Sequence, residues 1–365
     1  MSFSLLFYSI SFGFIFLYLI LIYLYKLGFT NYPSYTTSSS SKADIWASII
    51  ISARNPNENL QKLIVQLNSQ INSDKIEIII VDDFSDNEIL HSASNLPINY
   101  YKLRDEKPNL SNLKNNKKEA ISLAVEKAKN EYIVCLDSDV ILDEKWWLII
   151  SNFIVDNNPK FAAGFHRYIP SKSFLNQFLC IEQDILTASS IAALQFKFPT
   201  MCNGANMVFS KSAFLSVNGY KGLYQTNGGD DLFLYHRIYA QFPSETFYVK
   251  NLGASVSSEA PRTKSNLFKQ RSRWIEKSTS YENVGILIQS IIIFLTNLIC
   301  TISIFLPTLL PIFILKIFMD IWFILSIKSF YRFVFPLNRI LYFMILYPLY
   351  VMSVFLIFLI KKIVK

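Results

Sequence analysis

Acidic residues follow two buried, strand-like runs of the sequence. Asp82 and Asp83 come immediately after the run EIIIV. Asp137 directly follows a second run, EYIVCL, and Asp139 stands two residues further on. Parallel strands bring their carboxyl ends to one edge of a sheet, which is where α/β proteins bind ligands. We therefore expect the two acidic pairs to meet at that edge.

Carboxylates that meet in this way need a cation. Oxygen ligands of this kind suit Mg2+ or Mn2+, which keep waters and substrate phosphates in their remaining positions. Asp137-Ser138-Asp139 is an Asp-x-Asp pattern, in which one carboxylate reaches the metal and the other holds the ribose or a metal-bound water. Alone the pattern is a weak signal, because aspartates are common in turns after strands for backbone capping.

The segments that carry these residues alternate between strand and helix patterns. Strands are expected at 45–53, 77–81 and 131–136. Amphipathic helices are expected at 58–70 and 117–129. Strands buried on both faces and joined by helices predict an α/β fold with a mostly parallel, doubly wound sheet and right-handed crossovers.

Other nucleotide and metal chemistries lack their sequence signatures. No GxxxxGK[ST] or GxGxxG motif is present, so phosphates must be held by a metal and side chains. His91, His166 and His236 show no metal-ligand spacing and are expected to be surface or partner-bonded residues. The four cysteines form neither a CxxC pair nor a disulfide framework.

The chain is too apolar for an ordinary soluble protein, with 52% hydrophobic and 17% charged residues. An uncharged run at 5–25, followed by Lys26, is long enough to cross a bilayer. We expect a membrane anchor at 1–27 rather than a cleaved signal peptide, because no basic start or small-residue cleavage site is present. A Ser-rich linker at 28–43 and a single domain at 44–283 are expected to follow.

The C-terminal region, residues 284–365, is more hydrophobic still. The apolar stretches that predict its two to three membrane helices lie at 284–305, 308–327 and 340–360. Lys316 and Asp320 interrupt the middle stretch, so it crosses, re-enters or lies along the interface, with these charges facing protein or headgroups rather than lipid. Basic residues on both sides of the last stretch give the positive-inside rule no consistent answer.

The net charge of +8 does not indicate nucleic acid. The basic residues are spread along the chain rather than gathered in an arm, and several flank the apolar stretches. Anionic headgroups and a diphosphate explain the charge better.

Residues 45–285 resemble glycosyltransferase family 2 through motifs that occur in the family's order. The first are SIIISARNPNENLQKLIVQLNSQ, EIIIVDDFSDNE, a Lys-x-x-Ala helix and EYIVCLDSDV. CNGANMVFSKSAFLSVNGY is similar to the acceptor-side segment, GGDDLFLYHRI to the segment with the catalytic base, and QRSRW to the Gln-x-x-Arg-Trp motif. The resemblance implies a GT-A type nucleotide-diphospho-sugar transferase domain that binds Mn2+ or Mg2+.

The resemblance also implies roles for single residues on the donor side. Asp82 and Asp83 would contact the uracil and ribose of a UDP-sugar, although a GDP-sugar stays open. Asp137 would contact the nucleotide and, with Asp139, the metal on the diphosphate. Lys117 would offset the charge of the diphosphate or belong to a solvated helix face, and the solvated reading is favoured for its neighbour Lys118.

Two further groups of residues are implied on the acceptor side. Asp231 would act as the base of an inverting transfer, with Asp230 orienting it or sharing the role. In the Gln-x-x-Arg-Trp motif, Arg273 would contact the diphosphate, Trp274 would stack on acceptor or donor, and Gln270 would be a further substrate-binding residue. Arg273 and Trp274 can also be read as headgroup contacts and an interfacial anchor.

The sequence departs from the family pattern at two positions. Asn57 stands where many members have Glu, and Asn116 stands where a Gly usually precedes the Lys. Neither change removes an expected catalytic atom, but the loop before Lys117 is left without its usual residue.

The acceptor is inferred from the layout. One anchor before the domain and a few spans after it resemble ceramide glucosyltransferase, which favours single transfer to a lipid-linked or membrane-proximal hydroxyl. The Gln-x-x-Arg-Trp motif also occurs in processive polysaccharide synthases, which remain the first alternative. A non-enzymatic membrane scaffold is the second. The chemistry implies an integral protein of the inner or plasma membrane with its catalytic domain in the cytoplasm.

Overall fold

The computed structural model describes residues 3–37, 41–56, 58–87, 96–110, 116–223, 229–278, 283–332 and 335–364. Two residues named above, Asn57 and His91, lie outside the described residues. The chain divides into two compact units. The sheet unit comprises Pro33–Ile169 and Lys197–Glu259, and the helical unit comprises Met1–Tyr32, Pro170–Phe196 and Ala260–Lys365.

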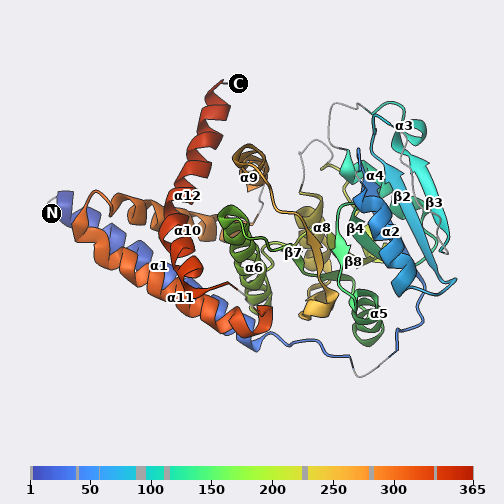
Figure 1. The fold of residues 1–365 in the computed structure, drawn as a ribbon, viewed down its shortest axis with the longest axis horizontal. Coiled ribbons are helices and arrows are strands. Elements are labelled where there is room, and N and C mark those ends of the chain that lie inside the picture. The colour runs from blue at the N-terminus through green and yellow to red at the C-terminus, as the bar shows by residue number, and fades with distance from the viewer. Residues whose placement is uncertain are drawn as a thin grey trace. The chain divides into compact units, whose positions relative to one another are not determined.

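The sheet unit is built around one large sheet. Its strands are β1 (Ala47–Ala53), β2 (Ile76–Asp82), β3 (Ile98–Lys102), β4 (Tyr132–Asp137), β6 (Phe161–Ala163), β8 (Asn206–Ser210) and β9 (Thr246–Tyr248). Within the described residues these seven strands follow the order β3-β2-β1-β4-β8-β6-β9 (Figure 1). All neighbours are parallel except β8, which is antiparallel to both β4 and β6. The expected α/β fold with a mostly parallel sheet is confirmed.

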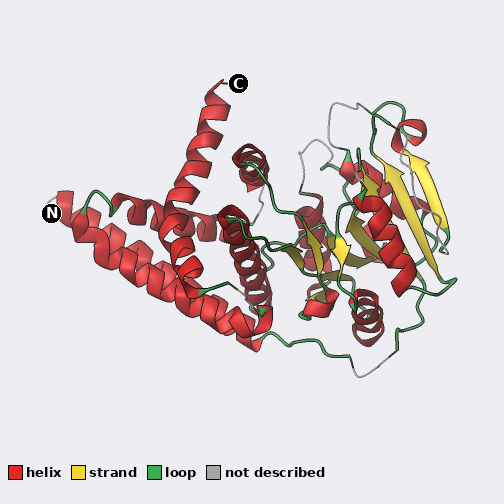
Figure 2. Cartoon of the chain, viewed as in Figure 1, coloured by secondary structure: helices red, strands yellow, loops and turns green. Residues whose placement is uncertain are grey.

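Helices flank the strands of this unit (Figure 2). They are α2 (Asn59–Gln70), α3 (Leu103–Glu106), α4 (Lys117–Lys127), α5 (Trp146–Asn157), α7 (Lys211–Ser216) and α8 (Asp230–Gln241), with short 3-10 turns at Pro243–Glu245 and Leu252–Ala254. A small second sheet has the order β5-β10-β7 and consists of β5 (Ile141–Leu142), β10 (Val256–Ser258) and β7 (His166–Tyr168).

Both faces of the central strands are covered, which explains their near-continuous apolar runs. Ile49 and Ile51 of β1 belong to a core cluster that includes residues of α2 and α5. Ile50, on the opposite face of the same strand, is equally buried, and α4 packs against β1 and β2. A strand buried on both sides in this way is held in one register, so the residues at its carboxyl end are fixed in place.

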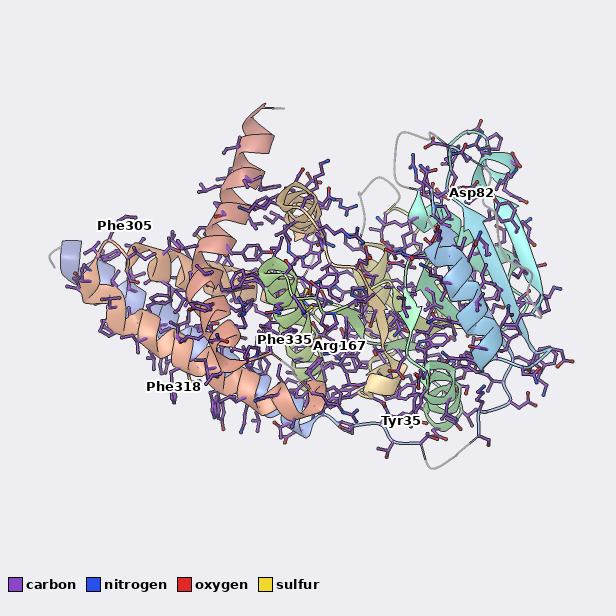
Figure 3. The ribbon with its side chains drawn as sticks, viewed as in Figure 1. Tyr35, Asp82, Arg167, Phe305, Phe318 and Phe335 are labelled. Atoms are coloured by element: carbon purple, nitrogen blue, oxygen red, sulfur yellow. The ribbon has the colours of Figure 1, made fainter. Side chains whose placement is uncertain are left out.

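The helical unit contains the apolar segments. Its helices are α1 (Phe3–Asn31), α6 (Phe174–Gln195), α9 (Lys264–Ser278), α10 (Val284–Ile302), α11 (Leu310–Tyr331) and α12 (Leu337–Val364), with a 3-10 turn at Pro307–Leu309. By length and composition, four helices among the described residues can cross a membrane: Leu6–Asn31, Val284–Ile302, Pro307–Tyr331 and Leu337–Ile360. Phe318 lies exposed on the third of them, as expected of a lipid-facing position, and Phe305 is exposed in the connection between the second and the third (Figure 3).

The two compact units group the helices in another way than the domains expected from sequence, whose bounds stay predictions. The first helix continues through Asn31, past the expected end of the anchor at residue 27. Helices α6 and α9 lie inside the single domain expected at 44–283, but they pack against α1 and α12 and belong to the helical unit. Gly28 explains one of these contacts, because a Cβ there would lie 2.4 Å from the carbonyl oxygen of Ala192 in α6. A glycine therefore lets the two backbones approach closely.

Two charged residues are buried among the apolar helices. Lys316 is fully buried, and its Nζ lies 2.5 Å from Oδ2 of Asp320, one helical turn further along α11. The Tyr18 hydroxyl of α1 donates to Asp320 Oδ1 over 2.6 Å. The Lys316 Nζ also lies 5.6 and 5.7 Å from the ring centres of Tyr18 and Tyr347. The expectation that these charges face protein rather than lipid is confirmed, and the cluster joins α1, α11 and α12.

Removal of one member of this cluster tests its contribution to stability. Lys316→Met leaves the Asp320 carboxylate buried without its cation, and we expect a loss of about 3–5 kcal/mol. Lys316→Met combined with Asp320→Leu removes both charges and should recover most of that loss. The measurement is the thermal midpoint of the detergent-solubilised full chain, with the exposed substitution Phe318→Leu on the same helix as control. A Lys316→Met midpoint equal to that of the control would contradict the expectation.

Candidate active site

The strand register brings the acidic residues to one edge of the sheet. β1 lies between β2 and β4, and all three run in parallel. Asp82 at the end of β2 is level with Ala53, and Asp137 at the end of β4 is level with Ser52. The carboxyl ends of the strands therefore carry both acidic pairs, as the positions after EIIIV and EYIVCL predict.

Both carboxylate oxygens of Asp82 accept hydrogen bonds from other residues of the protein. It is 3% exposed, and its Oδ1 accepts the backbone N–H of Ser85 over 2.8 Å. Its Oδ2 accepts the hydroxyl of Tyr100 over 3.2 Å. Oδ1 therefore holds the turn that follows β2, and Oδ2 ties it to β3. The predicted contact of Asp82 with the nucleotide stays a prediction.

One carboxylate oxygen of Asp83 has no hydrogen-bond partner among the described residues. The residue is 2% exposed, and its Oδ2 accepts the backbone N–H of Asn116 over 3.2 Å. Its Oδ1 is buried and has no hydrogen-bond partner within the described part of the chain. Burial raises the pKa of the Asp83 carboxyl, although Asn116 and Arg54 oppose this shift. An unpartnered buried acceptor is costly, so a ligand N–H at this position would be favourable.

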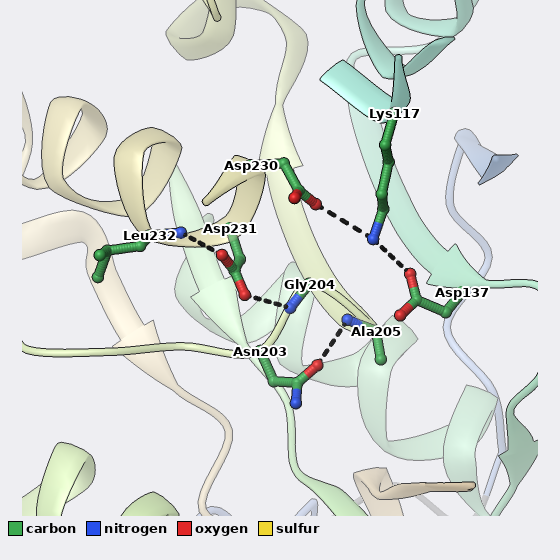
Figure 4. A network of polar contacts seen from close by, with 8 residues as sticks. All are labelled: Lys117, Asp137, Asn203, Gly204, Ala205, Asp230, Asp231 and Leu232. Carbon is green, nitrogen blue, oxygen red and sulfur yellow. Dashed lines mark hydrogen bonds and ion pairs between the residues drawn. The ribbon is translucent and has the colours of Figure 1, made fainter. Parts of the chain in front are cut away.

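Lys117 links the Asp-x-Asp segment to α8 (Figure 4). Its Nζ lies 2.6 Å from Asp137 Oδ1 and 3.1 Å from Asp230 Oδ2. Burial lowers the pKa of Lys117, but the charges of Asp137 and Asp230 outweigh burial and raise it well above its usual value. The ammonium therefore stays charged and joins the end of β4 to the first turn of α8.

Asp231 is held by backbone N–H groups. Its Oδ2 accepts the N–H of Gly204 over 3.2 Å, and its Oδ1 accepts the N–H of Leu232 over 2.8 Å (Figure 4). These two donors fix the orientation of the carboxylate. Asp231 is half-buried and next to Asp230, so the carboxylate lies beside the ion pair of Lys117.

Two glycines allow this arrangement. A Cβ on Gly204 would lie 3.1 Å from Asp230 Oδ2 and 3.4 Å from Lys117 Nζ, which is closer than ordinary contact. Gly229 has a φ of +77°, and a Cβ there would lie 2.5 Å from the Phe233 ring. Gly229 thus starts α8 so that both aspartates occupy its first turn, where the helix dipole favours negative charge.

The donor set around Asp139 fits a divalent cation that also binds phosphate. Desolvation raises the pKa of the Asp139 carboxyl, and the neighbouring charge of Asp137 raises it further. Within the described residues, no cluster of three His, Cys, Asp or Glu side chains forms a complete protein site. Mg2+ is typically bound by one or two carboxylates plus substrate phosphates, so Asp137 and Asp139 suffice for that type of site.

Lys118 corrects the interpretation that it belongs to a solvated helix face. It is 5% exposed, and its Nζ donates to the carbonyl oxygen of Leu223 over 2.8 Å. The same ammonium lies 5.3 Å from the centre of the Phe233 ring in α8. The solvated reading was wrong because the first turn of α4 packs against α8 rather than facing water.

The remaining predicted residues are the two described histidines and the motif residues of α9. His166 Nε2 is 2.8 Å from Ser258 Oγ, and His236 Nε2 is 3.1 Å from the carbonyl oxygen of Thr200, so both are partner-bonded as expected. Gln270, Arg273 and Trp274 lie on α9 of the helical unit. Their contact with the diphosphate and acceptor stays a prediction.

Gly204 is the site residue that the motif reading did not single out. It lies in the segment CNGANM, which was read only as an acceptor-side segment. A signal was present, because the chain has only 10 glycines, and a glycine close to the start of a strand indicates a close approach of the backbone.

Comparisons with known proteins agree with this fold. Residues 48–216 match the family described as Glycosyl transferase family 2. No curated protein matches the sequence. Among solved structures, the mannosyltransferase PcManGT from Pyrobaculum calidifontis, in complex with GDP-Man and Mn2+, has a TM-score of 0.57 at 12% identity, and the alignment covers 97% of each chain.

A second solved structure is similar over a smaller part of the chain. It is glucosyl-3-phosphoglycerate synthase from Mycobacterium tuberculosis with Mn2+, UDP-glucose and phosphoglyceric acid. The alignment covers 64% of this chain and 81% of that chain, with 14% identity and a TM-score of 0.44.

The bridging role of Lys117 is open to test by substitution. Lys117→Met leaves Asp137 and Asp230 close together without their shared cation, so we expect the free energy of unfolding to fall by about 1–3 kcal/mol. Sugar transfer should also fall by at least about tenfold, because the first turn of α8 loses its tie to β4. Denaturant unfolding and initial rates measure both effects. Lys62→Met, an exposed lysine paired with Glu58, is the control, and equal behaviour of the two variants would contradict the role.

Proposed function

We propose, since residues 48–216 belong to glycosyl transferase family 2, that this protein is an inverting transferase that moves a sugar from a nucleotide-sugar to a lipid-linked or membrane-proximal hydroxyl. The observation that carries the proposal is the oriented carboxylate of Asp231, placed beside the Lys117 bridge to Asp137. A base on one side and a diphosphate-binding edge on the other are what direct displacement requires.

The donor is proposed to be a UDP-sugar. Within the described residues the Oδ1 of Asp83 has no partner, which supports a contact with the nucleobase, because an N–H of uracil can donate to it. Asp82 lies one residue earlier and holds the turn that shapes this end of the pocket. Guanine also presents N–H groups, and the structurally similar PcManGT is bound to GDP-Man, so a GDP-sugar is the alternative.

Asp139 and Asp137 are proposed to hold Mn2+ or Mg2+ together with the donor diphosphate. The metal would offset the negative charge that develops on the leaving nucleoside diphosphate. The carboxylate chemistry of the two residues supports this assignment, and Mn2+ is present in the PcManGT structure. Lys117 keeps Asp137 in place through its ion pair, so the segment is oriented before the donor arrives.

Asp231 is proposed to be the base. The acceptor hydroxyl transfers its proton to the Asp231 carboxylate while its oxygen bonds to the anomeric carbon. The bond from that carbon to the diphosphate breaks on the opposite face, so the configuration inverts. The backbone N–H groups of Gly204 and Leu232 hold the carboxylate still during this step. Asp230 is occupied by Lys117 and orients the first turn of α8.

Gln270, Arg273 and Trp274 are proposed to complete the donor and acceptor contacts. Their i, i+3, i+4 spacing on α9 places the three side chains on one face of the helix. Arg273 is exposed, which leaves its guanidinium accessible to a diphosphate. Trp274 would stack on a sugar ring of the acceptor or donor.

The membrane setting supports the proposed acceptor. Four candidate spans among the described residues flank the sheet unit in sequence, one before it and three after it, and they support an acceptor held in the same bilayer. Single transfer is preferred over processive synthesis because so few spans supply little material for a polymer channel. A cytoplasmic catalytic domain at the inner or plasma membrane follows from a nucleotide-sugar donor.

A panel of nucleotide-sugars tests this function directly. The detergent-purified full chain is incubated with each donor and Mn2+, with and without extracted membrane lipids, and released nucleoside diphosphate is measured. We expect release from one UDP-sugar that lipid stimulates and a chelator abolishes. Release from a GDP-sugar alone would contradict the proposal that the donor carries uracil. Release that is insensitive to the chelator would contradict the proposal that a metal ion is bound.

Asp231→Asn separates the proton acceptor from donor binding. We expect the rate of transfer to fall by about 100-fold or more, because an amide cannot take the acceptor proton. The dissociation constant of the donor, measured by titration, should change little. Asp143→Asn is the matched control, because Asp143 is exposed and its Oδ1 accepts the backbone N–H of Lys145. Near-normal transfer by Asp231→Asn would remove Asp231 from the role of base.

A further inference from the structure

One arginine of α9 stands between the residues of the Gln-x-x-Arg-Trp motif and is not itself part of the pattern. Arg271 is 4% exposed, whereas Arg273, two residues on, is exposed. An Nη of Arg271 forms an ion pair with Oε2 of Glu182 in α6. Its Nε donates to the Tyr350 hydroxyl of α12 over 2.7 Å. The buried guanidinium therefore joins α9 to two other helices of the helical unit.

The same guanidinium contacts two members of the motif. The other Nη of Arg271 donates to Gln270 Oε1 over 3.1 Å. The guanidinium carbon lies 3.9 Å from the centre of the Trp274 ring, which is a close cation–π contact. Gln270 and Trp274 thus both contact the guanidinium of Arg271. Glu182 and Tyr350 hold the same guanidinium in place.

The chemistry of this position demands arginine. A guanidinium is planar, so its edge can donate to Glu182, Tyr350 and Gln270 while its face stacks on an indole. A lysine ammonium carries the same charge but has neither a flat face nor a fork of donors. Charge alone therefore does not account for the set of contacts that Arg271 makes.

We propose that Arg271 is a positioning residue that sets the orientation of Gln270 and Trp274, and that Glu182 and Tyr350 hold it in place. The proposal rests on the proposed function, in which the motif contacts donor and acceptor. Under this proposal α6 and α12 also help to position the motif, because they carry Glu182 and Tyr350. Glu182 lies 88 residues before Gln270 in the sequence, and nothing in the motif itself names it.

Stability and positioning can be separated because the ion pair is buried. Loss of one partner leaves a buried charge and destabilises the fold, whereas loss of both partners together is often close to neutral. A double variant, Arg271→Met with Glu182→Gln, should therefore fold as well as the parent. It still lacks the group that orients Gln270 and Trp274, and any loss of activity it shows is not a folding defect.

The experiment compares the parent, Arg271→Lys, the double variant and Lys269→Gln as full chains in detergent. Each is also made with Trp274→Phe for the emission measurement, and Gln270→Ala is added for the kinetics. Lys269 is an exposed residue of the same helix and serves as the control. The readouts are the thermal midpoint, kcat and KM for the donor and the acceptor, and the emission of Trp274, isolated as the difference from Trp274→Phe.

We expect Arg271→Lys and the double variant to keep a thermal midpoint close to that of the parent. Their kcat/KM should fall on the order of tenfold to a hundredfold, because displaced contact groups lose most of their effect. The Trp274 emission should change in both, because the ring loses its stacked guanidinium, and Lys269→Gln should match the parent. Parent-like kinetics and emission in the double variant would overturn the positioning role.

Failure of the proposed function would look different. If Trp274→Phe and Gln270→Ala leave kcat and KM unchanged, the motif does not contact the substrates, whatever Arg271 does. If these variants impair transfer while the double variant does not, the motif role stands and the role of Arg271 is rejected.

Discussion

The site depends on one cation placed between carboxylates of separate elements. Asp137 ends a strand and Asp230 begins a helix, and their mutual repulsion would push β4 and α8 apart. Lys117 occupies the space between them at 2.6 and 3.1 Å, so the same charges that would separate the elements hold them together. Asp231 can then reach the Gly204 N–H, because its neighbour Asp230 is already tied down. The position of the proposed base is thus a consequence of an ion pair in which it takes no part.

The helical unit follows the same electrostatic rule in apolar surroundings. Lys316 with Asp320, and Arg271 with Glu182, are buried pairs with a tyrosine hydroxyl at each: Tyr18 in the first and Tyr350 in the second. Charges withdrawn from water require partners for each donor and acceptor, and the tyrosine supplies a second hydrogen bond at each pair. Because each tyrosine comes from another helix, Tyr18 from α1 and Tyr350 from α12, each cluster also specifies which helices pack together.

The parts of the fold that follow from local pattern are predictable from sequence. Apolar runs form β1, β2 and β4. Because these strands are parallel, the residues at their carboxyl ends, among them Asp82 and Asp137, lie at one edge of the sheet. Lys118 was misread because a lysine in the first turn of an amphipathic helix carries no sign of the helix that will cover it. The assignment of α6 and α9 to the helical unit cannot be derived from the sequence for a related reason. Their packing partners are chosen by contacts such as Gly28 against Ala192, and such contacts exist only in the folded chain.

The Gln-x-x-Arg-Trp motif does not reveal which residues hold its side chains in place. A motif records side chains that face the same ligand, here on the face of α9 that carries Gln270, Arg273 and Trp274. A residue that supports them must point away from that face, into the protein, and its partners vary with whatever packs there. Arg271 fits this description, since its guanidinium is buried against Glu182 and Tyr350 while Arg273 remains exposed. Two arginines that are two residues apart therefore have opposite surroundings, and only the structure can tell which one supports the site and which one is accessible to a substrate.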